Sequence, residues 1–114
     1  MAESDVKAAV KKILDKHKPH IRYYMPVQTG MGESGIEDFV CCAYGRYVGI
    51  ETKDTGKRQT PNQMRREENI NAAHGLYLLI HPETTHLVDY LCARLAERYH
   101  DSIAKSNSGP TQAG

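Results

Sequence analysis

Asp38, Glu51 and Lys53 are the residues of this chain whose types and spacing point most directly to chemistry. Two carboxylates on one face of a sheet supply the oxygen ligands that Mg²⁺ prefers, and they leave its other positions to water and a substrate phosphate. A cation held in this way lowers the pKa of a bound water and stabilises negative charge on the phosphate. A lysine beside it can hold the nucleophile or the developing oxyanion. The three residues therefore suit hydrolysis of a phosphodiester, provided that the fold brings them together.

A predicted β-hairpin brings them together. Two β-prone runs flank Gly45-Arg46, and glycine in the first central position of a two-residue connection is typical of a type II′ turn. Pairing outward from this turn places Asp38 opposite Lys53, and Glu51 points to the same side because side chains alternate with period two. Directly opposed Cβ atoms lie roughly 5 Å apart and diagonal ones roughly 7 Å. One cation could therefore bind both carboxylates.

A simpler arrangement of the same residues also fits the hairpin. Asp38 and Lys53 could form a cross-strand ion pair worth under about 1 kcal/mol, with Glu51 solvated beside them. The geometry of the predicted hairpin alone leaves both interpretations open.

Hydrophobic periodicity predicts the elements that must position these residues. Apolar residues at helical spacing predict helices over 4–17 and 85–99, and β-prone runs predict strands over 21–27, 39–44, 47–52 and 76–80. Thr60 followed by Pro61 and Gln63 is typical of a capped helix start. Gly75 after His74 is typical of a left-handed helix end. A third helix is therefore expected between these two signals.

The order of the elements predicts an α/β fold. It reads αβββαβα, and a helix between the third and fourth strands is typical of a crossover that makes two strands parallel. We expect a mixed four-stranded sheet flanked by helices. The 114 residues suffice for one core, which we assign to residues 1–104, and the small polar segment 105–114 is expected to be a flexible C-terminal tail.

Composition limits the function classes that fit this chain. The net charge of +1 gives no overall attraction to polyanions, so nucleic-acid binding would need a local basic patch. No apolar segment approaches the roughly 20 residues that span a bilayer, and the N-terminus lacks the pattern of a secretory signal. We therefore expect a cytoplasmic protein without a membrane partner. The three Cys and six His lack the spacing of a zinc site.

Three motifs in order resemble the VRR-NUC branch of the PD-(D/E)XK nuclease superfamily. They match a strand of the Gly-x-x-Asp-Phe type, a strand that ends Ile-Glu-x-Lys, and a helix start with Gln three residues after Thr. In this chain they read Gly35-Ile36-Glu37-Asp38-Phe39, Ile50-Glu51-Thr52-Lys53 and Thr60-Pro61-Asn62-Gln63. The resemblance extends from Glu3 to about Ile80, and the ordered set is far more specific than a lone Glu-x-Lys. It implies a restriction-endonuclease-like core.

The resemblance also implies an activity, which is Mg²⁺-dependent endonuclease cleavage of DNA, with Mn²⁺ able to replace Mg²⁺. The catalytic residues that it implies are Asp38, Glu51, Lys53 and Gln63. The metal ligands that it implies are Asp38, Glu51 and the backbone carbonyl of Thr52, with Glu3 as an added acidic ligand. Small stand-alone members of the family are phage-type nucleases, some of them homodimers that cut branched DNA such as Holliday junctions. The resemblance therefore extends to a homodimer, and to the host cytoplasm if the protein is phage-encoded.

Three of these residues have alternative interpretations. A glutamate in a first helical turn, such as Glu3, is also favoured by the helix dipole. Gln63 could bond its own backbone in a capping box and so be unavailable to the site. Glu37 stands where the family commonly has Pro, and strand alternation predicts that it points away from the face of Asp38.

Basic residues after the Glu-x-Lys strand are candidates for DNA binding. Lys57 and Arg58 lie in a glycine-containing loop, and Arg65 and Arg66 follow in the first turns of the next helix. All four could reach phosphates beside a metal. For the two helical arginines, a solvated charged face is the alternative. For the chain as a whole, the alternative to an enzyme is a non-catalytic module on a nuclease-like fold that binds nucleic acid or a protein.

Overall fold

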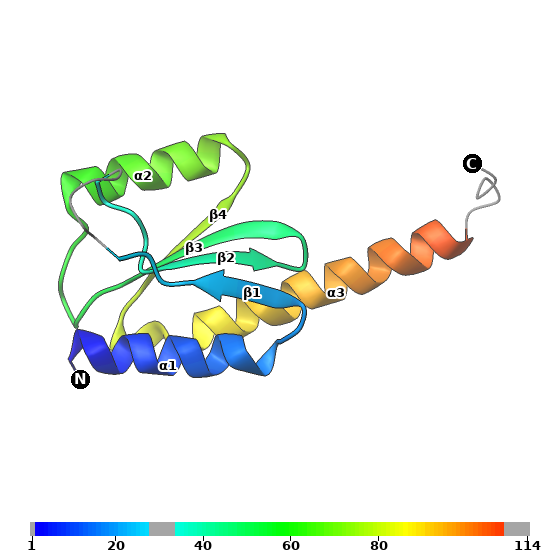
Figure 1. Ribbon diagram of the computed structural model, residues 1–114, viewed down its shortest axis with the longest axis horizontal. Coiled ribbons are helices and arrows are strands. Elements are labelled where there is room, and N and C mark those ends of the chain that lie inside the picture. The colour runs from blue at the N-terminus through cyan, green and yellow to red at the C-terminus, as the bar shows by residue number, and fades with distance from the viewer. Residues whose placement is uncertain (1, 28–33, 109–114) are drawn as a thin grey trace.

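The computed structural model describes residues 2–27 and 34–108. Its elements follow one another in the predicted order (Figure 1). They are α1 (Glu3–Lys16), β1 (Ile21–Tyr24), β2 (Phe39–Ala43), β3 (Arg46–Thr52), α2 (Pro61–Ala72), β4 (Leu76–Ile80), the 3-10 turn η1 (Pro82–Thr84) and α3 (His86–Ser108). Most of the glycine-rich segment before β2 lies outside the described residues.

The four strands form one mixed sheet in the order β1-β2-β3-β4. The pairs β1–β2 and β2–β3 are antiparallel, and β3–β4 is parallel. The parallel pair requires a crossover, which α2 supplies. Figure 1 shows α1 and α3 on one face of the sheet and α2 on the other. The predicted α/β architecture is confirmed.

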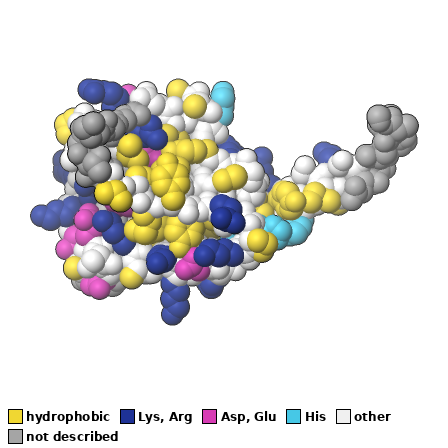
Figure 2. Space-filling model, in the orientation of Figure 1, with side chains coloured by type: hydrophobic (Ala, Val, Ile, Leu, Met, Phe, Trp, Pro, Cys, Tyr) yellow, Lys and Arg dark blue, Asp and Glu magenta, His cyan; other side chains and the backbone are white. Residues whose placement is uncertain are grey.

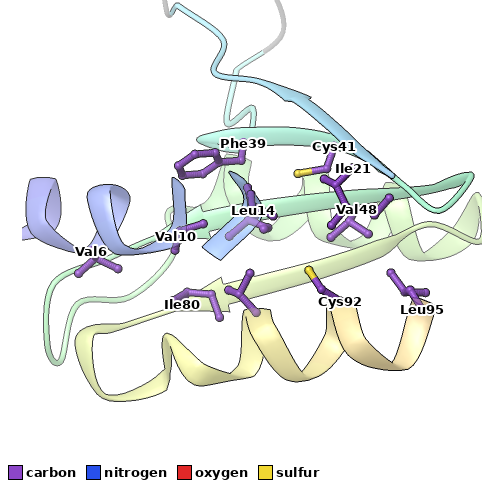
Figure 3. Close-up of a cluster of buried hydrophobic side chains, with 13 residues drawn as sticks. Val6, Val10, Leu14, Ile21, Phe39, Cys41, Val48, Ile80, Cys92 and Leu95 are labelled. Atoms are coloured by element: carbon purple, nitrogen blue, oxygen red, sulfur yellow. The ribbon is translucent and has the colours of Figure 1, made fainter. Parts of the chain in front are cut away.

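The apolar core lies between the sheet and the pair α1 and α3 (Figure 3). Val6, Val10 and Leu14 repeat every four residues along α1 and are at most 1% exposed, as expected for the apolar stripe of a surface helix. The strands contribute alternate residues to the same layer, and α3 adds residues from the same side of the sheet as α1. These further core residues are Ile21, Phe39, Cys41, Ala43, Val48, Ile50, Ile80, Val88, Cys92 and Leu95.

The opposite face of the sheet has a different character. Along α2 a single residue, Ile70, is buried, whereas the β3 positions that alternate with the core are Tyr47, Gly49 and Glu51. Polar side chains therefore fill much of the layer between α2 and the sheet. The candidate site lies at one end of this layer.

The β2–β3 turn differs from the predicted one. Its central residues are Tyr44 and Gly45, with φ of 52° and 84°, and Ala43 pairs with Arg46. Positive φ at both central residues defines a type I′ turn, whose twist matches that of the flanking strands. The predicted type II′ turn at Gly45-Arg46 is wrong by one residue. The register consequently shifts by two residues, so that Phe39 pairs with Ile50 and each paired side chain keeps its predicted face.

Two helix ends also differ from expectation. His74, with φ of 67°, takes the left-handed position after α2 that was predicted for Gly75. Gly75 is needed for a different reason, because a Cβ there would lie 2.9 Å from the Ile70 side chain. The helix α3 continues to Ser108, further than the predicted helix end at 99, and its last turns project beyond the sheet (Figure 1). Residues 109–114 lie outside the described residues. Within the described chain, no helix is long and apolar enough to cross a membrane.

Candidate active site

Glu51 is the buried acid at the centre of the site. It lies near the end of β3 and is 3% exposed. Its Oε2 accepts a hydrogen bond from Nε2 of Gln63 at 2.8 Å and lies 3.8 Å from Nζ of Lys53. Its Oε1 is buried and has no hydrogen-bond partner among the described residues. Burying a carboxylate oxygen without a hydrogen-bond donor destabilises the folded state. Binding of a proton or a cation to this atom would offset that cost.

The surroundings of Glu51 shift its titration towards neutral pH. Burial, followed by the negative charge of Asp38, raises the pKa of Glu51 from 4.5 to about 7, and the ammonium of Lys53 opposes this rise. Desolvation and a like charge both disfavour the ionised form, whereas a cation favours it. Glu51 is therefore a group whose charge would respond strongly to a bound cation.

Asp38 reaches the site from a bend immediately before β2. Its Oδ2 accepts hydrogen bonds from the backbone N–H of Thr52 at 2.9 Å and from the Thr52 hydroxyl at 2.5 Å. Its Oδ1 lies 3.7 Å from Nζ of Lys7 on α1. The predicted placement of Asp38 opposite Lys53 is therefore corrected, because Asp38 lies beyond the paired part of β2 and is anchored to the end of β3. The ammonium of Lys53 instead lies near Glu51.

Gln63 serves the helix cap and the site at the same time. Its Oε1 accepts a hydrogen bond from the backbone N–H of Thr60, and its own backbone N–H donates to the Thr60 hydroxyl. This is the predicted capping box. Its Nε2 remains free to donate to Glu51. The alternative interpretation, in which capping makes the side chain unavailable to the site, is wrong, since an amide offers an oxygen and a nitrogen to different partners.

Glu3 lies at the first turn of α1 and is exposed. Its charge acts in the same direction as that of Asp38 on the pKa of Glu51, but more weakly. Across residues 2–27 and 34–108, no three His, Cys, Asp or Glu side chains gather closely enough to hold a metal ion. Glu3 does not complete such a group, and its role as a ligand stays a prediction.

The oxygen atoms at this end of β3 are of the chemical type that a hard divalent cation binds. Asp38 and Glu51 offer two carboxylates, and the buried Thr52 between Glu51 and Lys53 offers a backbone carbonyl at the same end of β3. Mg²⁺ is commonly bound through one or two carboxylates, with water completing its octahedron. The unpartnered Oε1 of Glu51 is the observation that favours a cation here.

Comparison with solved structures identifies the fold. No protein-family model matches the sequence, and no curated protein matches it significantly. A solved structure described as a VRR_NUC domain protein matches with a TM-score of 0.65 at 17% identity, over 85% of this chain and 89% of its own. The chain has the VRR_NUC fold. A second solved structure, described as a VRR_NUC domain, matches with a TM-score of 0.58 at 19% identity, over 85% of this chain and 96% of its own.

Three of the four predicted DNA-binding residues are exposed next to the site of this VRR_NUC fold. Lys57 and Arg58 lie in the loop between β3 and α2, and Arg65 lies on α2. A hydrogen bond of 2.8 Å between Nε2 of His81 and the Lys57 carbonyl oxygen holds the loop in place. Arg66 is different, because its Nε is 2.5 Å from a carboxylate oxygen of Glu37 and its side chain is 20% exposed. This internal ion pair directs Arg66 towards Glu37, and its role in DNA binding stays a prediction.

Glu37 is the residue whose position the sequence predicts least well. It is fully buried, and a Cβ on Gly49 would lie only 2.7 Å from its Cγ. Glu37 therefore lies on the α2 side of the sheet, the side of Gly49, whereas Asp38 contacts Lys7 of α1. The predicted orientation away from Asp38 agrees with these contacts, although it arises from the bend at Asp38 and not from strand alternation. Lys7 was likewise absent from the predicted site. Because Lys7 is one of several lysines along α1, its sequence position does not predict the contact with Asp38.

Proposed function

We propose that this protein is a divalent-metal-dependent endonuclease that hydrolyses phosphodiester bonds of DNA. The observation that carries the proposal is the buried Oε1 of Glu51, which lacks a hydrogen-bond partner among the described residues and belongs to a carboxylate flanked by Asp38 and Lys53. The VRR_NUC fold supports it, since the domain is nuclease-like in architecture. The three residues suit phosphodiester hydrolysis in chemical type as well as in position.

Each residue of the site has a distinct role in the proposed reaction. Mg²⁺, or Mn²⁺ in its place, would supply an activated water and stabilise charge on the phosphate. Asp38 and Glu51 would hold the ion, together with the backbone carbonyl of Thr52. Gln63 orients Glu51 through its 2.8 Å hydrogen bond. The Lys53 ammonium, with its side chain 14% exposed, would stabilise negative charge that develops on the phosphate.

DNA would approach over the loop between β3 and α2. Lys57, Arg58 and Arg65 are exposed there, and basic side chains at such a position bind phosphates irrespective of base sequence. The chain has a net charge of only +1, so this local group would have to supply the electrostatic attraction. Binding should accordingly weaken steeply as salt concentration rises.

Branched DNA as substrate and a homodimer as the active form are further parts of the proposal. An apolar surface over the strands between α1 and α2 is compatible with a second copy (Figure 2). A hollow on this face is lined by Tyr24, Val40 and Cys42, and Tyr24 is 62% exposed. Contiguous exposed apolar surface is typical of protein interfaces. Light scattering of the purified protein would measure its mass in solution directly.

A non-catalytic binding module is the second candidate. One observation favours it, because Oδ2 of Asp38 already accepts two hydrogen bonds from Thr52 and Oδ1 lies near Lys7. In that case Asp38 would fasten the chain to β3 without any cation. Such a module would bind DNA or a protein equally well with and without a divalent ion.

The decisive experiment incubates purified protein and Mg²⁺ with four-way junction, flap, duplex and single-stranded DNA. We expect cleavage that EDTA abolishes and that the variants Asp38→Asn, Glu51→Gln and Lys53→Ala each reduce by at least about a hundredfold. Lys12→Ala, on the exposed face of α1, is the matched control for lysine removal and should cleave normally. Cleavage that survives Lys53→Ala, or that needs no divalent ion, would contradict the mechanism.

A further inference from the structure

Three polar side chains form a largely buried cluster beside the site, and two of them, Glu37 and Tyr47, are not among the site residues that the sequence predicts. Glu37 is fully buried, and its two carboxylate oxygens accept from Nε of Arg66 at 2.5 Å and from the Tyr47 hydroxyl at 2.6 Å. The Arg66 guanidinium also donates to the Tyr47 hydroxyl at 3.2 Å. We call these three residues the Glu37 cluster. It joins the segment before β2 to β3 and to α2.

Stability alone does not explain such a cluster. The free energy lost by desolvating a buried ion pair is often as large as the free energy gained from its attraction. Well-packed apolar residues commonly stabilise a fold equally well. What short, charge-assisted hydrogen bonds do provide is a fixed geometry. Glu37 immediately precedes Asp38 in the chain, so whatever fixes Glu37 also limits where the Asp38 carboxylate can lie.

A second contact fastens the same segment to α2. Gly35 has φ of 76°, and a Cβ there would lie 2.6 Å from the backbone carbon of Asn62 and 2.8 Å from the nitrogen of Gln63. The segment 35–38 is therefore held against the first turn of α2 at Gly35 and against its second turn by the ion pair of Glu37 with Arg66. At its far end, Asp38 binds Thr52 of β3.

We infer that the Glu37 cluster is a positioning device for Asp38. Its three residues act on the site through Asp38, as positioning residues. The helix α2 then positions both carboxylates, since Gln63 bonds Glu51 and Arg66 bonds the residue before Asp38. The consequence for catalysis rests on the proposed function, whereas the placement of Asp38 can be tested without it.

The backbone N–H of Thr52 reports the placement of Asp38 directly, because it donates to Asp38 at 2.9 Å. The next N–H, that of Lys53, donates to the Ile80 carbonyl at 2.9 Å and is a matched internal control. The experiment measures amide hydrogen exchange by NMR in Glu37→Gln/Arg66→Met, which removes both charges together. We expect the Thr52 amide to exchange about ten times faster relative to the Lys53 amide. Equal acceleration of both amides, or no change in either, would overturn the inference.

Two further variants keep this test decisive. Arg65→Met removes an exposed arginine from the same helix and should leave the ratio of the two exchange rates unchanged. Tyr47→Phe removes only the hydroxyl and is expected to fold even if the double variant does not. It should shift the ratio in the same direction by a smaller factor, and an unchanged ratio in Tyr47→Phe would contradict the inference.

Metal binding separates the inference from the proposed function. If wild-type protein binds Mn²⁺, Glu37→Gln/Arg66→Met should weaken the affinity by about tenfold or more, as is typical for residues that orient a ligand. Tyr47→Phe, which removes one hydrogen bond of the cluster and no charge, should weaken the affinity by a smaller factor. Unchanged affinity in the double variant would overturn the inference. Absence of Mn²⁺ binding by the wild type would overturn the proposed function and leave the exchange result to decide the positioning.

Discussion

The side-chain amide of Gln63 binds Glu51 and the start of its own helix simultaneously. Its nitrogen donates to Oε2 of Glu51 at 2.8 Å while its oxygen accepts from the N–H of Thr60 at the same distance. The cap fixes the side chain, and the fixed side chain aims one donor at the buried carboxylate. A structural motif and a site contact are thereby combined in one residue.

Gln63→Glu separates these two roles. Glutamate can still accept from the N–H of Thr60 in a capping box, but it offers no donor to Glu51 and adds a negative charge. We expect the pKa of Glu51 to rise above its value of about 7, while the helix cap is retained. Carbon-detected NMR titration of the Glu51 carboxyl measures this shift. An unchanged titration would show that the hydrogen bond does not influence Glu51.

Thr60→Ala is the complementary variant. It removes the hydroxyl that accepts from the N–H of Gln63 and should cost about 1 kcal/mol of stability. The titration of Glu51 should change less than in Gln63→Glu, because the amide nitrogen keeps its carboxylate partner. Urea denaturation and the same NMR titration check the two expectations.

The contribution of Glu51 to the free energy of unfolding of the metal-free protein should fall as pH rises from about 4.5 to about 7. Its pKa in the folded protein, about 7, is above the ordinary value of 4.5. Between these values the folded state holds a proton that the unfolded state has lost, so raising the pH favours unfolding. A shift of this size corresponds to about 3 kcal/mol, reached in full above the folded pKa.

Glu51→Gln isolates this contribution. The neutral amide does not titrate, so the free energy of unfolding of Glu51→Gln minus that of the wild type should grow with pH across the window and level off above it. Denaturant titrations at several pH values measure the difference. A difference that is constant, or that shrinks as pH rises, is incompatible with a raised pKa at Glu51.

Lys7 should compete with a cation for Asp38. Its ammonium lies 3.7 Å from Oδ1 of Asp38, with its side chain 36% exposed. Removing a partly exposed ion pair of this kind changes an equilibrium by under about 1 kcal/mol, so Lys7→Met should tighten Mn²⁺ binding by a few-fold in the absence of DNA. Lys11→Met, one turn further along α1 and exposed, controls for the loss of one positive charge. Weaker binding in Lys7→Met would mean that Lys7 supports the site.

Gly35 and Gly56 form a matched pair for testing the contact between the Asp38 segment and α2. Both have φ of 76°, but a Cβ on Gly56 meets nothing within 4 Å, whereas one on Gly35 would lie 2.6 Å from Asn62. Gly56→Ala should cost about 1–2 kcal/mol for the left-handed conformation alone. Gly35→Ala should cost a further 1–3 kcal/mol or so for overpacking. Equal losses of stability in urea denaturation would rule out the close approach to α2.

Local sequence signals predict most of this fold because their physical causes are local. The four-residue spacing of Val6, Val10 and Leu14 specifies the buried face of α1 without reference to the rest of the chain. The Thr60–Gln63 box specifies the start of α2 in the same way. The predicted hairpin turn lies one residue away from the turn in the structure, because glycine fits either a type I′ or a type II′ turn and tyrosine is an unusual residue for positive φ.

The candidate site is less completely predictable, because several of its contacts join residues that are distant in sequence. The pair of Glu51 with Lys53 follows from strand alternation. The contact of Asp38 with Lys7 and the ion pair of Glu37 with Arg66 do not, since each depends on how a helix lies across the sheet. The bend before β2 removes the one rule, alternation, that could have oriented Glu37.

Titration calorimetry with Mn²⁺ at about pH 8, where Glu51 is largely ionised, tests the central claim that Asp38 and Glu51 together hold a divalent cation. The account predicts saturable binding to the wild type, and loss of that binding in both Asp38→Asn and Glu51→Gln while each variant remains folded. A wild-type protein that takes up no Mn²⁺, or variants that bind it as the wild type does, would contradict the claim.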